Sequence, residues 1–92
     1  MKYIRFEHFD DVNDDWVDEI IVFPRSINHD CMAEVSRGIK DTMHGSWKRI
    51  RRAPVSAGFV TSDLKCYGKS ESLALESFEE EDTEILRKQF NV

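Results

Sequence analysis

The first quarter of the chain alternates between apolar and polar residues and then breaks into a turn. Residues 3–9 follow this two-residue period, which is typical of a strand with one buried face. Turn-forming residues fill positions 10–15, and residues 16–23 end in a β-branched run before Pro24. We therefore expect two strands joined as a hairpin, with the second strand the more central one in its sheet.

The segment that follows has a helical period. Its apolar residues recur at steps of three or four, at Met32, Val35, Ile39 and Met43. Short polar side chains within residues 26–28 can cap the start of a helix, and Gly45 can end it. The pattern predicts an amphipathic helix that buries Val35 and Ile39.

The second half of the chain predicts shorter elements. Residues 47–61 are strand-like, but Pro54 and Gly58 interrupt them, which indicates an edge or a bulge. Two shorter strand-like segments follow at 64–67 and 73–75, with a turn expected between them.

A second helix is expected near residue 80. Ser77 and Glu80 have the spacing of a capping box, in which each side chain satisfies an N–H group near the other. Acidic residues at 79–82 and basic residues at 87–88 suit the helix dipole. The buried face would consist of Ile85, Leu86 and Phe90.

Together these elements predict an α+β fold in the order β-β-α-β-β-(β)-α. The sheet is mainly antiparallel, with four to five strands, and we expect the two helices to cover one of its faces. The chain has 92 residues, of which 40% are hydrophobic, so it fits a single domain spanning residues 1–92.

The charges are segregated along the sequence. Residues 1–30 carry a net charge of −5, residues 31–69 carry +5 and residues 70–92 carry −5. Such a chain can fold so that its ends neutralise its middle, or it can present faces of opposite sign to partners.

The densest basic stretch lies in the middle segment, beside an aromatic residue. It consists of Trp47, Lys48, Arg49, Arg51 and Arg52. On a strand, Arg49 and Arg51 would share one face, where basic and aromatic groups can hold phosphates and stack on bases. The alternative is a charged edge strand that resists aggregation and is neutralised by the acidic residues at 79–84.

A second candidate site lies where the first expected helix begins. Arg25, Ser26 and Asn28 supply hydrogen-bond donors at a point where free N–H groups and the helix dipole favour an anion. An ordinary helix cap with an exposed arginine explains the same residues, and we favour that interpretation.

The reactive side chains form no recognisable catalytic or metal-binding pattern in the sequence. On a helix, His29 would not face Cys31 as a base must face a nucleophile. The histidines and cysteines lack the spacing of zinc ligands, and the calcium-loop and phosphate-loop patterns fail at residues 11–22 and 63–70. We therefore predict no catalytic residue, no bound metal and no cofactor.

The two cysteines, Cys31 and Cys66, bear on the compartment. The first residues lack the apolar segment of a signal peptide, and no apolar run approaches the roughly 20 residues needed to span a bilayer. We expect reduced thiols and a cytoplasmic location, and a single disulfide between the two cysteines is the alternative.

Residues 23–30 and 66–72, together with the short length and high charge density, resemble small accessory proteins carried by bacteriophages and prophages. The similarity concerns the general character of the whole chain and points to no family of known activity. It implies a host-cell cytoplasm and a role in binding or inhibiting another molecule, and it carries over no functional residues.

We therefore expect a small non-enzymatic module that binds or inhibits a partner through protein–protein contact. The alternative is an anion, nucleotide or nucleic-acid binder that uses residues 25–28 and the basic segment at 48–52. The net charge of −5 weighs against general nucleic-acid binding, because affinity for a polyanion depends on positive potential.

Overall fold

In the residues that it describes, the computed structural model has two helices and six antiparallel strands, so the α+β prediction is confirmed. It describes residues 1–10, 12–43 and 53–91, with the backbone alone at 37–43. The elements are β1 (Lys2–Asp10), β2 (Asp15–Phe23), α1 (His29–Met43), β3 (Ala53–Val60), β4 (Cys66–Tyr67), β5 (Lys69–Ser70), β6 (Leu75–Glu76) and α2 (Glu79–Gln89). Neither helix, as far as it is described, is long and apolar enough to cross a membrane.

The predicted hairpin is present, but its second strand lies at the edge of the sheet. β1 and β2 pair without interruption from Lys2 opposite Phe23 to Asp10 opposite Asp15. The order of the larger sheet is β2-β1-β3-β4, so β1 is central and the expectation for β2 is wrong. The physical reason is that β1 buries successive residues, including Tyr3 and Ile4, on both of its faces.

The β3 strand carries the irregularity that its proline and glycine predict. Its register against β1 shifts between Arg5 and Phe6, next to Pro54. At Gly58, a Cβ atom would lie 2.3 Å from the carbonyl oxygen of Tyr67, so only glycine lets β4 approach this closely. The strand expected at 64–67 is shorter, because Leu64 adopts a positive φ of 62°.

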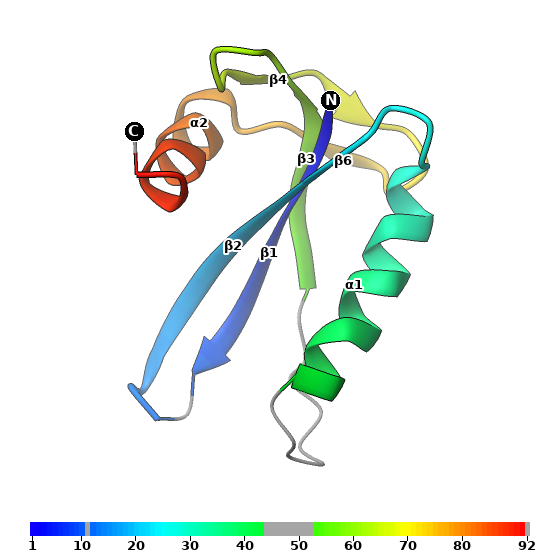
Figure 1. Ribbon diagram of the computed structural model, residues 1–92. Coiled ribbons are helices and arrows are strands. Elements are labelled where there is room, and N and C mark those ends of the chain that lie inside the picture. Colours follow the sequence, from blue (N-terminus) through cyan, green and yellow to red (C-terminus); the bar gives the residue numbers. More distant parts are fainter. Residues whose placement is uncertain (11, 44–52, 92) are drawn as a thin grey trace.

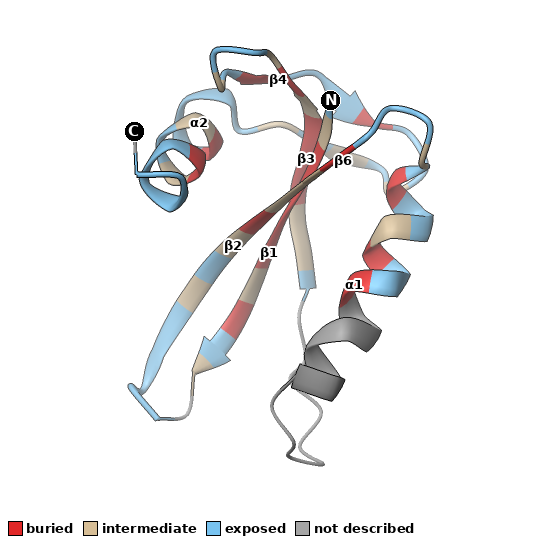
Figure 2. Cartoon of the chain, viewed as in Figure 1, coloured by how far each residue is buried: buried red, intermediate tan, exposed pale blue. Residues whose placement is uncertain are grey.

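The two helices cover opposite faces of the sheet, which contradicts the expectation of one shared face (Figure 1). The core on the α1 side consists of Ile4, Phe6, Phe23, Ala33 and Ala57. The core on the α2 side consists of Tyr3, Ile20, Val60, Cys66 and Leu86. Since β1 is apolar on both faces, each face needs its own cover, and the buried residues follow the strands through the middle of the molecule (Figure 2).

The α1 helix is rotated relative to the stripe predicted from the sequence. Its buried residues are His29, Ala33 and Ser36, whereas Val35 is exposed, so the prediction for Val35 is wrong. Small side chains at the contact let the helix lie close to the sheet, and this close packing decides which face turns inward. Ile39 lies beyond the side chains that the structure describes in α1.

The α2 helix buries Leu86 as predicted, but its start and its end differ from the prediction. Its N-cap is Phe78 and has no side-chain cap, so the capping box between Ser77 and Glu80 is wrong. The Ser77 hydroxyl instead hydrogen-bonds the Tyr3 hydroxyl on β1. Phe90, expected in the core, is exposed because the helix ends at Gln89.

Candidate functional site

A buried arginine joins the hairpin to α2 and fixes how the two lie together. Arg5 of β1 is only 6% exposed and donates to Asp82 at 3.1 Å, to Asp18 at 3.0 Å and to Glu81 at 3.3 Å. Burial opposes its charge, but hydrogen bonds to Asp18, Glu81 and Asp82 outweigh burial and raise the pKa of Arg5. The carboxylate of Asp18 on β2 is thus held in place by a permanent positive charge.

Beyond this anchored region the hairpin extends away from α2 (Figure 1). It ends in an exposed aromatic pair. Phe9 and Trp16 lie opposite each other, with ring centroids 5.5 Å apart and planes at 67°. Phe9 is 40% exposed, Trp16 is 62% exposed, and Val12 in the turn is 91% exposed. This is apolar surface that the fold leaves uncovered at the end of a two-stranded projection.

The aromatic pair lies in a wholly acidic stretch of sequence. Residues 7–19 contain seven aspartates or glutamates and no lysine or arginine. Asp10 shapes the turn, since its carboxylate accepts from the Val12 N–H at 3.0 Å and from the Asn13 amide at 2.7 Å. The hydrogen bond from Asn13, followed by that from Val12, lowers the pKa of Asp10. We call Phe9, Val12, Trp16 and the carboxylates of Glu7, Asp10, Asp14, Asp15, Asp18 and Glu19 the hairpin surface.

The outer edge of β2 is closed at one position by a side chain of α2. The Gln89 side-chain carbonyl accepts from the Ile20 N–H at 2.8 Å, and its amide donates to the Ile20 carbonyl at 2.6 Å. A carboxamide thereby makes the two hydrogen bonds that a neighbouring strand would make. The edge strand is partly protected in this way near the helix.

The three residues predicted to form a site at the start of α1 lie in different surroundings. The Arg25 guanidinium lies 5.2 Å from the centre of the Phe59 ring and 3.4 Å from the Tyr67 hydroxyl. Asn28 precedes the helix, and its carbonyl accepts from the Met32 N–H at 3.1 Å. Ser26 is exposed in the turn that connects β2 to α1.

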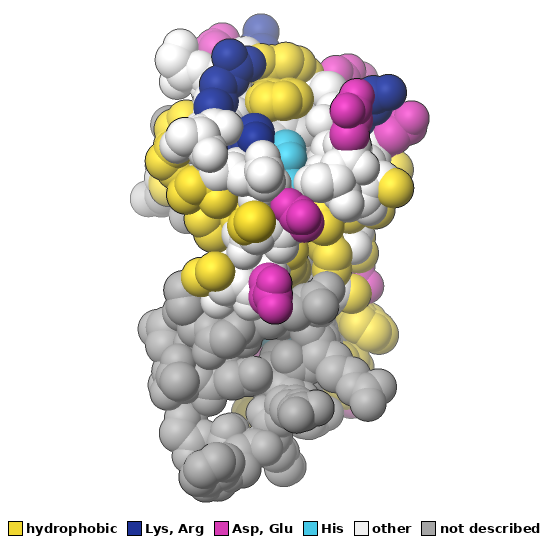
Figure 3. All heavy atoms as spheres, turned by 90° about the vertical axis from the view of Figure 1, so that its right-hand side faces the viewer, with side chains coloured by type: hydrophobic (Ala, Val, Ile, Leu, Met, Phe, Trp, Pro, Cys, Tyr) yellow, Lys and Arg dark blue, Asp and Glu magenta, His cyan; other side chains and the backbone are white. Residues whose placement is uncertain are grey.

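A cavity of about 600 Å³ opens beside these residues. Its walls include the cations Lys2 and Lys69, but also the carboxylates of Asp30 and Glu71. On this face, basic side chains gather near hydrophobic ones and a histidine, with acidic side chains nearby (Figure 3). The formal charges of the lining are therefore balanced, which makes it a poorer anion site than Arg25 and Asn28 alone predict.

His29 forms the floor of the same region. Its Nε2 lies 2.9 Å from the Gly58 carbonyl oxygen, and its ring packs edge-on against Phe23 and Phe59. Burial lowers the pKa of His29, so the ring is neutral at physiological pH and Nε2 donates its proton to Gly58. This histidine joins α1 to the sheet.

The basic segment of the sequence prediction lies outside the described residues. This holds for its five candidates, Trp47, Lys48, Arg49, Arg51 and Arg52. Two of the acidic residues expected to neutralise it, Glu81 and Asp82, accept hydrogen bonds from Arg5.

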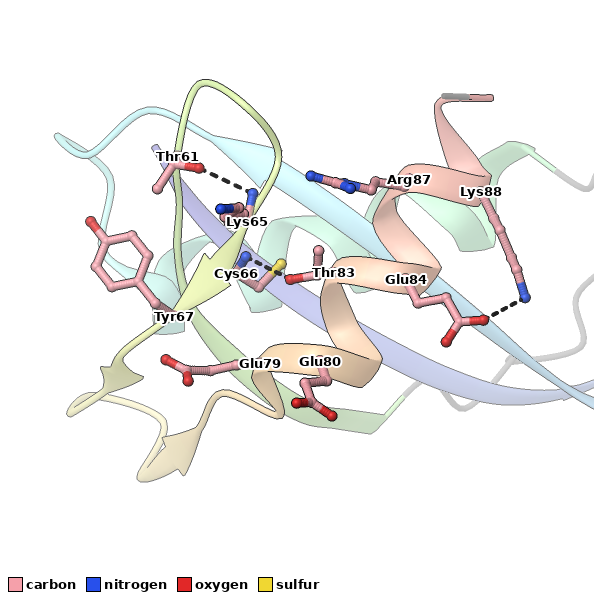
Figure 4. A pocket seen from close by; sticks show the side chains of 10 residues that line it. All are labelled: Thr61, Lys65, Cys66, Tyr67, Glu79, Glu80, Thr83, Glu84, Arg87 and Lys88. Carbon is pink, nitrogen blue, oxygen red and sulfur yellow. Dashed lines mark hydrogen bonds and ion pairs between the residues drawn. The ribbon is translucent and has the colours of Figure 1, made fainter.

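A groove of about 860 Å³ lies between β4 and α2, with charged side chains around it (Figure 4). The Cys66 N–H donates to the Thr83 hydroxyl at 2.9 Å, which ties the strand to the helix. Burial raises the pKa of Cys66 to about 11, so its thiol is protonated at neutral pH and is a poor nucleophile. In the described parts of the chain, no cluster of three His, Cys, Asp or Glu side chains could hold a metal ion.

Phe9 and Trp16 are the residues that sequence reasoning misses. Phe9 lies on the same face of β1 as Arg5 and Glu7, which the alternation marks as polar, and the register that places it opposite Trp16 follows from the turn between them. Their exposure follows from the position of α2, which covers the sheet only as far as Gln89 and Ile20. No protein family, curated protein or solved structure matches this chain.

Proposed function

We propose that this protein is a non-enzymatic module that binds a protein partner through its hairpin surface. The observation that carries the proposal is the exposed pair of Phe9 and Trp16 within a stretch that contains only acidic charge. Aromatic residues are enriched at the energetic centres of protein interfaces, and charged residues are typical of their rims.

The geometry of the aromatic pair supports a role in binding. Large aromatic side chains contribute much apolar area with few rotatable bonds, so ordering them on binding costs little entropy. The pair is already packed edge to face, and the Asp10 hydrogen bonds shape the turn that joins its two strands. A surface organised before binding retains more of its contact energy as affinity.

The charge of the hairpin surface selects the kind of partner. Its carboxylates repel nucleic acid and acidic proteins, and they attract a basic surface from a distance. Among them, the carboxylate of Asp18 is held by the Arg5 guanidinium at 3.0 Å. The partner we propose has an apolar contact for Phe9 and Trp16, surrounded by lysine or arginine.

The experiment that tests this proposal is affinity capture with matched variants. Three proteins are immobilised separately on a resin and incubated with lysate of the cells that encode the chain. They are the wild-type protein, the double variant Phe9→Ser/Trp16→Ser and the control Phe90→Ser. Phe90 is the matched control because it is an exposed aromatic residue at the end of α2. A protein retained by wild type and control but lost from the double variant supports the proposal, and equal retention by all three contradicts it.

A second candidate function is supported by the surroundings of Arg25. An anion at the start of α1 would meet Arg25 stacked on Phe59, together with the nearby lysines Lys2 and Lys69. Titration with inorganic phosphate and with ATP, followed by amide chemical shifts, tests it. Saturable shifts at residues 25–30 that disappear in Arg25→Ala support this anion site. If the wild-type protein shows no such shifts, the anion site is contradicted.

The proposal includes a cytoplasmic location. Cys31 and Cys66 are both free, one exposed and the other buried, as expected for thiols in a reducing compartment. Mass analysis of the protein isolated from its own cells tests this, and a modified or paired Cys31 contradicts it.

A further inference from the structure

We propose that the partner contributes an extended, basic segment that adds to the free edge of β2 along Asp15–Asp18, as a further strand of the sheet. This inference rests on the proposed function and specifies how the hairpin surface is used. It makes the backbone of β2 a binding element beside the side chains of Phe9 and Trp16.

The contact of Gln89 with Ile20 shows which backbone N–H and carbonyl groups of β2 point away from β1. In an antiparallel pair, successive residues point both their N–H and their carbonyl alternately toward the partner strand and away from it. Gln89 bonds both groups of Ile20 from outside the β1–β2 pair, so Ile20 points outward. Because the register is continuous, the backbone groups of Asp18 and Trp16 also point outward.

The outward-facing backbone groups of β2 differ in whether they already have a hydrogen-bond partner. Ile20 is closed by Gln89, and the Trp16 N–H donates to the Asp15 carboxylate at 2.8 Å. The outward backbone groups of Asp18 have no partner among the described residues. An edge strand with free backbone groups is a template for another strand, and among the described residues the outward groups of Asp18 are available for this.

The acidic side chains decide which strand fits. A second copy of this chain would bring Asp15, Asp18 and Glu19 close to the same residues of its partner, and like charges across strands repel. A strand that alternates lysine or arginine with apolar residues fits this edge, because Asp15 and Glu19 lie on one face of β2. Trp16 lies on the other face with Asp18, whose carboxylate is already paired with Arg5. An apolar residue of that strand would lie beside Trp16, which shares a face with Asp18.

The first test removes one backbone donor. Asp18→Pro deletes an N–H that points away from β1, and proline is tolerated at such edge positions. Asp18→Ala is the matched control, because it also loses the ion pair with Arg5 but keeps the N–H. The probe is an amidated peptide of alternating lysine and valine, seven residues long, with fluorescein at its N-terminus, and its binding is followed by fluorescence anisotropy.

Strand addition predicts that Asp18→Pro binds this peptide roughly ten-fold more weakly than Asp18→Ala, a factor worth about 1.4 kcal/mol. Equal affinities of these two variants overturn the inference. If both variants bind equally and Phe9→Ser/Trp16→Ser does not bind, the hairpin surface acts through side chains alone and the proposed function still stands. Failure of the wild-type protein to bind the peptide also overturns strand addition.

A second test uses wild-type protein, so it does not depend on the folding of a proline variant. Two peptides of the same sequence are methylated on alternate backbone nitrogens, one on the odd positions and the other on the even positions. A strand directs only one of these sets toward β2, so one peptide should bind roughly ten-fold more weakly than the other. Equal binding of both peptides shows attraction by charge alone and contradicts the inference.

Discussion

Gln89, the last residue of α2, hydrogen-bonds both backbone polar groups of Ile20 on the edge strand β2. The helix thereby closes the sheet edge at the level where its own cover of the sheet ends. Beyond this level the hairpin continues without the helix and carries Trp16 at the far end of β2. The position of one glutamine thus marks the boundary between the core of the domain and its candidate binding surface.

Replacing Gln89 by alanine should lower the free energy of unfolding by about 1–2 kcal/mol, because two partly buried backbone hydrogen bonds lose their partner. Urea unfolding measures the change. The neighbouring variant Lys88→Ala is the control and should change the stability by less than about 0.5 kcal/mol, since it removes an exposed pair with Glu84. Equal effects of the two variants would show that the Ile20 contact is not stabilising.

Replacing Asp82 by alanine should lower the free energy of unfolding by more, about 3–5 kcal/mol, because it leaves the buried charge of Arg5 without its most buried partner. The same change removes acceptors from the Tyr3 hydroxyl and from the Phe78 N–H. Glu81→Ala is the matched control, since Glu81 also pairs with Arg5 but is exposed, and its loss should cost about 1 kcal/mol or less. The denaturant midpoints of the two variants are compared at pH 7. A loss of stability in Asp82→Ala as small as that in Glu81→Ala would contradict a stabilising role of the buried network.

The two cysteines should differ in reactivity. Iodoacetamide at pH 8 should alkylate the exposed Cys31 first, while Cys66 reacts at a rate limited by unfolding, because burial raises its pKa to about 11. Peptide mapping by mass spectrometry after timed labelling separates the two sites. Rapid labelling of Cys66 in the folded protein would contradict its position between β4 and α2.

The same thiol gives a pH dependence of stability. Its ordinary pKa is 9.0 and its pKa in the fold is about 11, so between these values the folded state keeps a proton that the unfolded state loses. Stability from this group is therefore fully present below about pH 9 and falls as the pH rises toward 11. Cys66→Ala should make the decline shallower in thermal melts across this range, and an unchanged slope would contradict it.

Local elements of this fold could be predicted from the sequence, whereas their arrangement could not. The hairpin and both helices follow from short-range periodicity and turn residues. The capping box at Ser77 failed because Tyr3, which is distant in sequence, takes its hydroxyl. The choice of helix faces failed for a similar reason, since neighbouring buried residues Tyr3 and Ile4 on β1 require cover on both sides of the sheet.

The candidate site was only partly predictable for the same physical reason. The sequence shows that Arg25 and Asn28 precede a helix, but not that Asp30 and Glu71 line the same cavity as Lys2 and Lys69. It shows an acidic turn, but not that Phe9 and Trp16 stay exposed beside it. Exposure depends on where α2 lies, and that is fixed by long-range contacts such as the ion pair of Arg5 with Asp82.

Hydrogen exchange of the protein in complex with its captured partner locates the binding surface on the fold. Amide protection is compared between the free and the bound protein, residue by residue. Our account predicts new protection concentrated at residues 9–18, with the outward N–H of Asp18 among the amides that slow most. Protection at residues 25–30 and 67–72, with the hairpin unchanged, would contradict the account and place the binding surface at the start of α1.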